Sequence, residues 1–183
     1  MIHMVQKRDV LLDIILVLLK EENHLREISR ILAVPHATIL RKLNSLVNEG
    51  VLDFSFKGRN RVFFIKNTLQ ARNYVYNAER YKLNLLLEKY PSLSIILSEI
   101  IRNTNGLVIL FGSYAKFSAD KNSDIDIYIE TSDRKLKSKI EAINSKINVK
   151  IGEFDKNSLL IKEIIKEHVI LKGEELFYEK IFD

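Results

Sequence analysis

The chain contains no cysteine and no tryptophan, and it has only two prolines among its 183 residues. The absence of cysteine excludes disulfide bonds and thiolate metal sites, and it fits a reducing compartment. The longest apolar stretch, residues 11–19, contains Asp13 and is too short to cross a bilayer. No signal peptide is apparent. We therefore expect a globular protein of the cytoplasm with no membrane partner.

Positive charge is concentrated in one part of the chain. Residues 1–66 hold 11 Lys/Arg against 7 Asp/Glu, whereas residues 67–183 hold 18 against 17. Within the first part, residues 36–66 hold six basic groups against two acidic ones, which accounts for the whole local excess. A basic face confined to one small domain indicates a polyanionic partner for that domain.

The first third of the chain has the pattern of three helices followed by a hairpin. Apolar residues recur at helical spacing, Pro35 suits the opening of the third helix, and Gly50 suits a left-handed cap at its end. The basic turn Lys57-Gly58-Arg59-Asn60 then separates two short apolar runs, as in a β-hairpin. The predicted elements are helices at 10–20, 25–32 and 36–48 and strands at 51–56 and 61–66.

This order resembles the winged helix-turn-helix DNA-binding domains, and residues 37–65, ATILRKLNSLVNEGVLDFSFKGRNRVFFI, are similar to their recognition helix and wing. The resemblance covers residues 5–66. It implies that the third helix enters the major groove of double-stranded DNA and that the wing contacts the backbone or the minor groove. Two alternatives stay open: winged-helix domains also bind proteins, and charged residues often only solvate a helix or a turn. The implied DNA-binding residues are His36, Thr38, Arg41, Lys42, Ser45, Lys57, Arg59 and Arg61.

Residues 68–90 contain neither glycine nor proline and predict one continuous connecting helix. Two roles for this helix stay open. In the first, it pairs with its own copy in a homodimer, as in regulators that bind two-fold operators. In the second, it packs on its own domain.

The most informative segment is residues 112–126, GSYAKFSADKNSDID, which follows a short apolar run and leads into an alternating one. On a strand of that period Asp124 and Asp126 project from the same face, and their charges repel unless a cation lies between them. Mg²⁺ normally binds one or two carboxylates together with substrate phosphates. Gly112 and Ser113 would let backbone and hydroxyl donors approach a phosphate. The Gly-Ser pair and the Asp-x-Asp pair are each weak evidence alone, but together they predict a metal-nucleotide site.

An apolar strand, Gly-Ser, a loop and Asp-x-Asp on the next strand resemble the minimal nucleotidyltransferases of the DNA polymerase beta superfamily. The resemblance covers residues 91–183. It implies a small mixed sheet with helices, Mg²⁺ or Mn²⁺ as cofactor, and an NTP, with ATP expected, as substrate. Family members modify partner proteins or act as antitoxins, so a toxin is one implied partner. By this resemblance Asp124 and Asp126 are catalytic metal ligands, and Gly112, Ser113 and Lys116 bind the nucleotide.

Two positions depart from the family pattern. Glycine is usual where Phe117 stands, so we expect a turn of different shape there. The family also has a third carboxylate on the following strand, here expected at residues 147–154, whose polar face offers Asn148 and Lys150. Neither is an anionic ligand or an ordinary general base. Either Glu153 substitutes from near the strand end, or the catalytic set is incomplete.

The sequence therefore predicts an α+β protein with a winged helix-turn-helix domain at 1–67, a connecting helix at 68–90 and a nucleotidyltransferase-like domain at 91–183. Two functions stay open. One is a DNA-binding protein that binds Mg-NTP and transfers NMP to a partner protein or another acceptor. The other is a transcriptional regulator or antitoxin whose nucleotide-binding domain is catalytically incomplete. The further predicted elements are helices at 92–102, 133–145 and 157–166 and strands at 107–111, 125–129 and 169–171.

Overall fold

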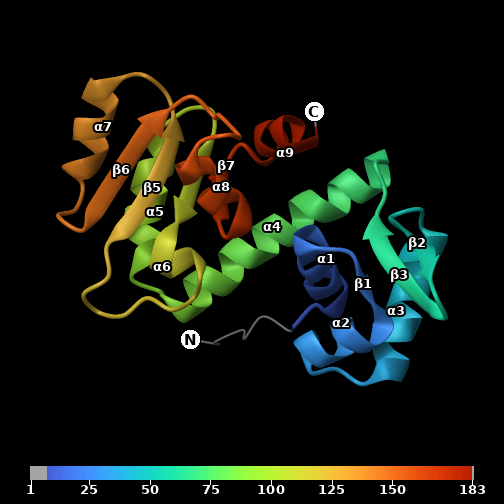
Figure 1. The fold of residues 1–183 in the computed structure, drawn as a ribbon. Coiled ribbons are helices and arrows are strands. Elements are labelled where there is room, and N and C mark those ends of the chain that lie inside the picture. Colours follow the sequence, from blue (N-terminus) through green and yellow to red (C-terminus); the bar gives the residue numbers. More distant parts are fainter. Residues whose placement is uncertain (1–7, 183) are drawn as a thin grey trace. The chain divides into compact units, whose positions relative to one another are not determined.

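The computed structural model describes residues 8–182, so residues 1–7 of the expected DNA-binding domain and Asp183 lie outside it. The described chain is mixed α+β, as expected, and divides into two compact units (Figure 1). One unit ends at Ala78 and the other begins at Glu79, within a single helix, α4 (Leu69–Lys89). No helix in residues 8–182 is long and apolar enough to span a membrane.

Within the described residues that precede α4, the N-terminal unit contains three helices and a small antiparallel sheet of order β1-β3-β2. The expected hairpin is present, with Lys57 paired to Asn60 and with Gly58 and Arg59 at its tip. A short strand that was not predicted, β1, pairs with the other edge of β3. The elements are α1 (Val10–Lys20), β1 (Asn23–His24), α2 (Leu25–Leu32), α3 (His36–Asn48), β2 (Leu52–Lys57) and β3 (Asn60–Ile65).

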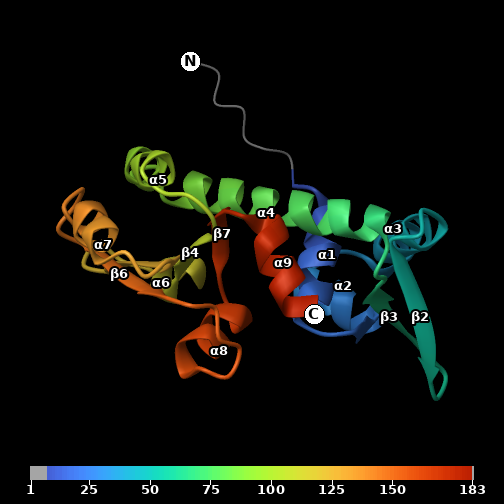
Figure 2. The same cartoon turned by 90° about the horizontal axis from the view of Figure 1, so that it is seen from above.

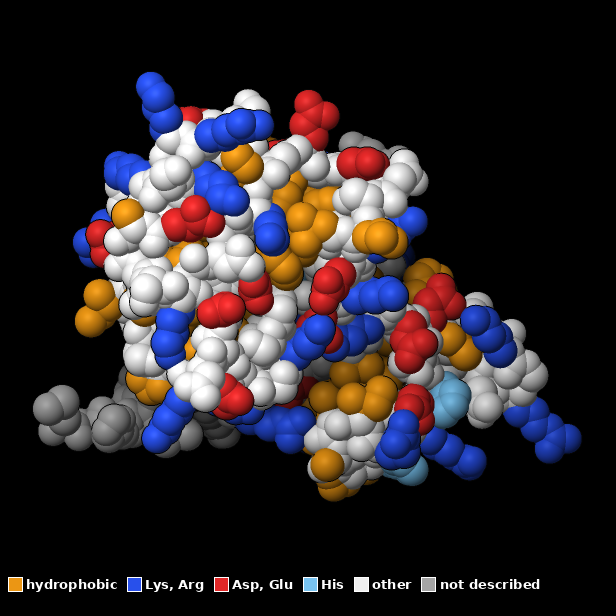
Figure 3. Space-filling view, turned by 60° about the vertical axis from the view of Figure 1, so that its left-hand side comes forward, with side chains coloured by type: hydrophobic (Ala, Val, Ile, Leu, Met, Phe, Trp, Pro, Cys, Tyr) orange, Lys and Arg blue, Asp and Glu red, His pale blue; other side chains and the backbone are white. Residues whose placement is uncertain are grey.

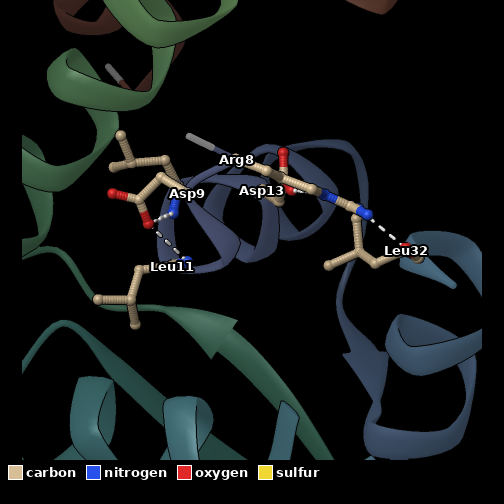
Figure 4. A network of polar contacts seen from close by, with 6 residues as sticks. Arg8, Asp9, Leu11, Asp13 and Leu32 are labelled. Atoms are coloured by element: carbon tan, nitrogen blue, oxygen red, sulfur yellow. Dashed lines mark hydrogen bonds and ion pairs between the residues drawn. The ribbon is translucent and has the colours of Figure 1, made fainter. Parts of the chain in front are cut away.

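The start of α1 is fixed by two neighbouring side chains. Asp9 caps the helix, because its Oδ1 accepts a hydrogen bond from the Leu11 amide at 2.9 Å. Arg8 Nε donates to Asp13 Oδ2 at 2.6 Å, and Arg8 Nη2 donates to the Leu32 carbonyl at 2.8 Å (Figure 4). Since Leu32 is the last residue of α2, Arg8 connects the beginning of α1 to the end of α2.

The orientation of α3 follows from its apolar side. Ile39, Leu43 and Leu46 are fully buried in the N-terminal unit, so the polar residues between them face outward. The helix ends at Asn48, and Gly50 then adopts φ +74°, which confirms the predicted left-handed cap. The chain enters β2 directly after this turn.

The C-terminal unit is built on a four-stranded mixed sheet of order β6-β5-β4-β7. β4 pairs antiparallel with β5 and with β7, whereas β5 and β6 are parallel. The elements are α5 (Leu93–Arg102), β4 (Val108–Phe111), α6 (Gly112–Ala115), β5 (Ile125–Glu130), α7 (Arg134–Glu141), β6 (Ile147–Gly152), α8 (Leu159–Lys166), β7 (Val169–Lys172) and α9 (Glu174–Phe182).

Four details of this unit differ from the sequence-based expectations. The one-turn helix α6 and the C-terminal helix α9 were not predicted. The helix expected at 133–145 ends at Glu141, because the chain then turns toward β6, with the Ile147 amide bonded to the Asn144 carbonyl. The strand expected at 147–154 ends at Gly152, because its partner strand ends at Glu130 and leaves nothing to pair with beyond that point.

Helices cover both faces of the sheet in the C-terminal unit, with α5 on one side and α8 on the other (Figure 2). Leu97 of α5 and Ile140 of α7 belong to one buried cluster with Ile127 of β5. Because side chains alternate along a strand, Asp126 and Tyr128 point to the opposite face. There Tyr128 contacts the ring of Phe154. Asp126 therefore lies on the sheet face away from the α5 layer.

Candidate functional site

The glycine of the Gly-Ser pair lies directly against an aspartate of the Asp-x-Asp pair. β4 and β5 are antiparallel, and their register places Phe111 opposite Asp126. The next residue, Gly112, has φ +72°, and a β-carbon built on it would lie 2.3 Å from Asp126 Oδ2. No other residue type fits this position without moving that carboxylate. The two halves of the motif, 14 residues apart in the sequence, thus form one site.

The parallel pairing of β5 with β6 adds two polar side chains. Asp126 lies opposite Asn148, and Tyr128 lies opposite Lys150. Asn148 Nδ2 donates a hydrogen bond to Asp126 Oδ1 at 2.9 Å. The residue beside Asp126 is therefore a neutral amide, on the strand where the family resemblance implies a carboxylate. Glu153 follows the end of β6 and is exposed.

Asp126 is half-buried, and its pKa is raised above the usual range of an aspartate. Burial is the largest cause, because it disfavours the charged form. The hydrogen bond from Asn148 opposes this effect, and the negative charge of Asp124 adds to it. Lys150 lowers the pKa and Glu163 of α8 raises it. A half-buried carboxylate whose charge is disfavoured by a neighbouring carboxylate is a group that a cation would stabilise.

The loop between the two halves of the motif is fixed at several points. Lys89 Nζ, at the end of α4, donates to the carbonyl of Phe117. The Ile125 amide donates to the Lys146 carbonyl at 2.8 Å, which secures the start of β5. Asp124 precedes this strand and is exposed. Phe117 adopts φ +55°, a backbone conformation that glycine favours.

Lys116 has an ionic partner that the sequence did not indicate. Its amide bonds to the Gly112 carbonyl at 3.1 Å, which places the residue in the turn that contains Gly112. Its Nζ lies 3.4 Å from Glu163 Oε1 on α8. Lys116 and Glu163 are 47 residues apart, so no local pattern in the sequence links them. They meet only because α8 packs near the turn that contains Lys116.

The donor set suits a cation that protein and substrate hold together. Asp124 and Asp126 offer carboxylate oxygens, which are the hard ligands that Mg²⁺ and Mn²⁺ accept. Within residues 8–182 no three His, Asp or Glu side chains gather closely enough to hold a metal ion. Mg²⁺ commonly binds one or two carboxylates plus substrate phosphates. The pair therefore fits such an ion, with the phosphates of a nucleotide supplying the remaining oxygens.

The residues of α3 that are expected to contact DNA differ in their exposure and in their contacts within the protein. His36 and Arg41 are exposed, and Thr38 and Lys42 are half-buried. Ser45 is engaged within the protein, because its Oγ donates to Glu49 Oε1 at 2.7 Å. The outward side of α3 thus presents His36 and Arg41 most openly.

On the hairpin, Arg59 lies exposed at the tip. Lys57 Nζ lies 3.4 Å from a carboxylate oxygen of Glu22. The guanidinium of Arg61 lies 4.6 Å from the centre of the Phe54 ring, a cation–π distance. Lys and Arg side chains are interspersed with Asp and Glu on the face of the molecule that Figure 3 shows. Of the three predicted wing residues, Arg59 is the one that makes no hydrogen bond, ion pair or cation–π contact within residues 8–182.

A buried polar network in the C-terminal unit was not predicted from the sequence. Glu79 of α4 is 2% exposed, and its Oε1 accepts a hydrogen bond from the Tyr178 hydroxyl at 2.7 Å. His168 Nε2 lies 3.5 Å from the same oxygen, an ion-pair distance, and His168 Nδ1 donates to the Ile164 carbonyl at 2.8 Å. Glu79 and Tyr178 are 99 residues apart, which explains why no local pattern revealed the contact.

Comparisons with known proteins agree with the resemblance of the C-terminal unit. Residues 97–176 match the family described as "Polymerase beta, Nucleotidyltransferase". A protein of Methanocaldococcus jannaschii named "putative protein adenylyltransferase" is 42% identical over 71 residues, which are 38% of this chain and 57% of that protein. The chain thus spans little more than half the length of this relative. A solved structure titled "Crystal structure of the toxin-antitoxin with AMP-PNP" is 24% identical, with a TM-score of 0.34, over 56% of this chain and 82% of that one.

Proposed function

We propose that the C-terminal unit binds a metal-nucleoside triphosphate, with ATP as the expected nucleotide, and transfers its nucleoside monophosphate to an acceptor. The observation that carries this proposal is the contact between Gly112 and the Asp126 carboxylate. It joins both halves of the motif within the residues that match the nucleotidyltransferase family. Asp124 and Asp126 would hold Mg²⁺ or Mn²⁺, which supplies neutralisation of the phosphate charge when bound. Ser113 and Lys116 would contact the phosphates.

The proposed reaction is a displacement at the α-phosphorus. An acceptor hydroxyl oxygen forms the new bond to phosphorus, the bond from phosphorus to the bridging oxygen of the β-phosphate breaks, and pyrophosphate leaves. The hydroxyl proton is released to solvent, and Asn148, which stands beside Asp126, is not a base that could accept it. Positioning and electrostatic stabilisation would then supply most of the rate enhancement.

The acceptor that we propose is a partner protein. The name of the relative from Methanocaldococcus jannaschii describes transfer of an adenylyl group to protein, and that relative is 42% identical over the 71 matched residues. A hydroxyl-bearing side chain of such a partner would receive AMP. A toxin controlled by this chain as its antitoxin is one partner of this kind.

A second function is a nucleotide-binding regulator without transfer activity. The observation that favours it is the hydrogen bond from Asn148 to Asp126, because a neutral amide rather than an anionic ligand lies beside that carboxylate. Such a protein would bind nucleotide through the aspartate pair and act as a transcriptional regulator or antitoxin.

For the N-terminal unit we propose binding to double-stranded DNA in the manner of a winged helix-turn-helix domain. Its order of three helices and a hairpin, the exposure of His36 and Arg41 on α3, and Arg59 at the hairpin tip support this proposal. The basic excess of residues 36–66 agrees with a polyanionic partner. A homodimer would place two such units on a two-fold operator.

Incubation of the full chain with α-labelled ATP and Mg²⁺ or Mn²⁺ tests transfer, alone and with proteins that co-purify with it. Label on a protein band, lost in the Asp124→Asn/Asp126→Asn double variant, would support transfer. Titration with unlabelled ATP tests binding in the same samples. Binding that requires the aspartates without any transfer would favour the regulator. Equal ATP affinity in the double variant would place the nucleotide elsewhere and contradict both.

A further inference from the structure

Glu163 occupies a fixed position on the solvent side of α8. The helix begins after Ser158, whose Oγ accepts a hydrogen bond from the Ile161 amide at 3.2 Å. Ile161 and Ile164 are buried, and they set the rotation of the helix against the rest of the C-terminal unit. Glu163 is the only acidic residue of α8 and is exposed. The packing of Ile161 and Ile164 therefore determines the direction in which Glu163 leaves the helix.

This carboxylate meets the ammonium group of Lys116, which belongs to the Gly-Ser turn. The two charged atoms are 3.4 Å apart, and the side chains are 49% exposed at Lys116 and 53% exposed at Glu163. An ion pair of this exposure contributes little to folding stability, because water screens the attraction and both long side chains lose freedom. It is also easily separated, since neither partner is held by burial.

The ion pair also places Glu163 beside the turn of the candidate site. Lys116 directly follows α6, and its amide bonds to the Gly112 carbonyl at 3.1 Å. The position of Glu163 identifies it as the anionic partner of the cation that is expected to contact phosphate.

Resting on the nucleotide site proposed above, we propose that Glu163 and the nucleotide phosphates are alternative partners of Lys116. Without nucleotide, Glu163 holds the ammonium group beside the turn. A triphosphate carries more negative charge than one carboxylate and replaces it, so that Lys116 moves to the phosphates and Glu163 is released to solvent. Glu163 is thus a positioning residue that keeps Lys116 at the site and lowers the affinity for nucleotide.

The proposal is tested by measuring the dissociation constant of Mg-ATP for the full chain by isothermal titration calorimetry. Glu163→Gln should tighten binding about two- to fivefold, the range expected when one exposed ionic partner is removed. Glu175→Gln on α9 is the matched control, because it removes the same charge from an exposed residue of the same unit, whereas the ion pair of Lys116 is with Glu163. The control should change the affinity by less than twofold.

A double-variant cycle separates exchange at Lys116 from general repulsion. Lys116→Gln should weaken binding, and the tightening by Glu163→Gln should shrink to less than half in that background. Two results would overturn the exchange: unchanged affinity in Glu163→Gln, or an equal gain in affinity with and without Lys116. Neither result would contradict the nucleotide site, provided that Asp124→Asn/Asp126→Asn still abolishes binding. ATP affinity that is absent in the wild type, or insensitive to the aspartates, would instead overturn the nucleotide site and the exchange together.

Discussion

Asn148 Nδ2 donates a hydrogen bond of 2.9 Å to Asp126 Oδ1 across the parallel pair β5–β6. The amide stabilises the negative charge of Asp126 but brings no negative charge of its own. Lys150, two residues further along β6, adds positive charge to the same surroundings and lowers the pKa of Asp126. The electrostatic balance therefore differs from that of a site with three carboxylates, and it suits one cation shared with phosphate better than two.

Asn148→Asp should convert this position into an anionic ligand. Without metal the variant should be less stable by about 1–2 kcal/mol, because a donor to Asp126 is lost and a like charge is added. With Mg²⁺ or Mn²⁺ the loss should be recovered, since metal affinity should rise about tenfold, or roughly 1.4 kcal/mol. Urea unfolding with and without the ion measures both effects. Asn148→Ala removes the donor without adding charge and should show no such recovery.

Gly112→Ala should damage the site through a defined collision. The added β-carbon would meet Asp126 Oδ2 at 2.3 Å, and the backbone at φ +72° is unfavourable for alanine. Gly106→Ala is a matched control, because Gly106 has φ +73° but no atom within 4 Å of the added carbon. Both variants should lose about 1 kcal/mol to the backbone conformation. Only Gly112→Ala should also lose ATP binding by tenfold or more, and equal ATP affinity in the two variants would contradict the predicted role.

The buried network around Glu79 should make folding stability depend on pH. Burial disfavours the Glu79 carboxylate, but the adjacent His168, Lys82 and the Tyr178 hydroxyl outweigh it and lower its pKa from 4.5. A lowered folded-state pKa adds stability that is present above the unfolded pKa and is lost as the pH falls below about 4.5. Glu79→Gln should therefore flatten the fall in unfolding free energy between pH 6 and pH 3.

Urea unfolding across this pH range measures that effect. Glu175→Gln on α9 is the control, because Glu175 is exposed and the substitution removes the same charge. Tyr178→Phe should cost about 1–2 kcal/mol at pH 7, since the buried carboxylate loses a donor. An acid slope that survives in Glu79→Gln would show that other carboxylates produce it.

Arg59→Ala should weaken DNA binding by the full chain through a phosphate contact. The slope of log affinity against log salt should fall by about one, with a similar loss for all sequences. Arg41→Ala should instead weaken binding to preferred sequences by about 1–3 kcal/mol and reduce discrimination between bases. Fluorescence anisotropy with genomic and random duplexes measures both. Lys162→Ala, an exposed lysine on α8, is the control and should leave the salt slope unchanged. No salt-dependent binding by the wild type would exclude DNA as the partner.

Local sequence patterns were sufficient for most of the secondary structure. The helix expected at residues 68–90 is Leu69–Lys89, and the hairpin around Gly58 and Arg59 has the expected turn. These elements are determined by side-chain periodicity and by turn residues within a few positions of one another. The strand β1 was missed, because two residues are too few to show a period. The Gly-Ser and Asp-x-Asp pairs were also visible in the sequence, since one short loop joins them.

Tertiary structure decided which side chains surround those pairs. The register of β5 with β6 places Asn148 beside Asp126, and the packing of α8 brings Glu163 to Lys116. The contact between Glu79 and Tyr178 joins residues 99 positions apart. Such contacts depend on how strands pair and helices pack, and a local period carries no information about either. The sequence by itself therefore determined the elements and the central motif, whereas the packing of distant segments determined the charges and hydrogen bonds that act on it.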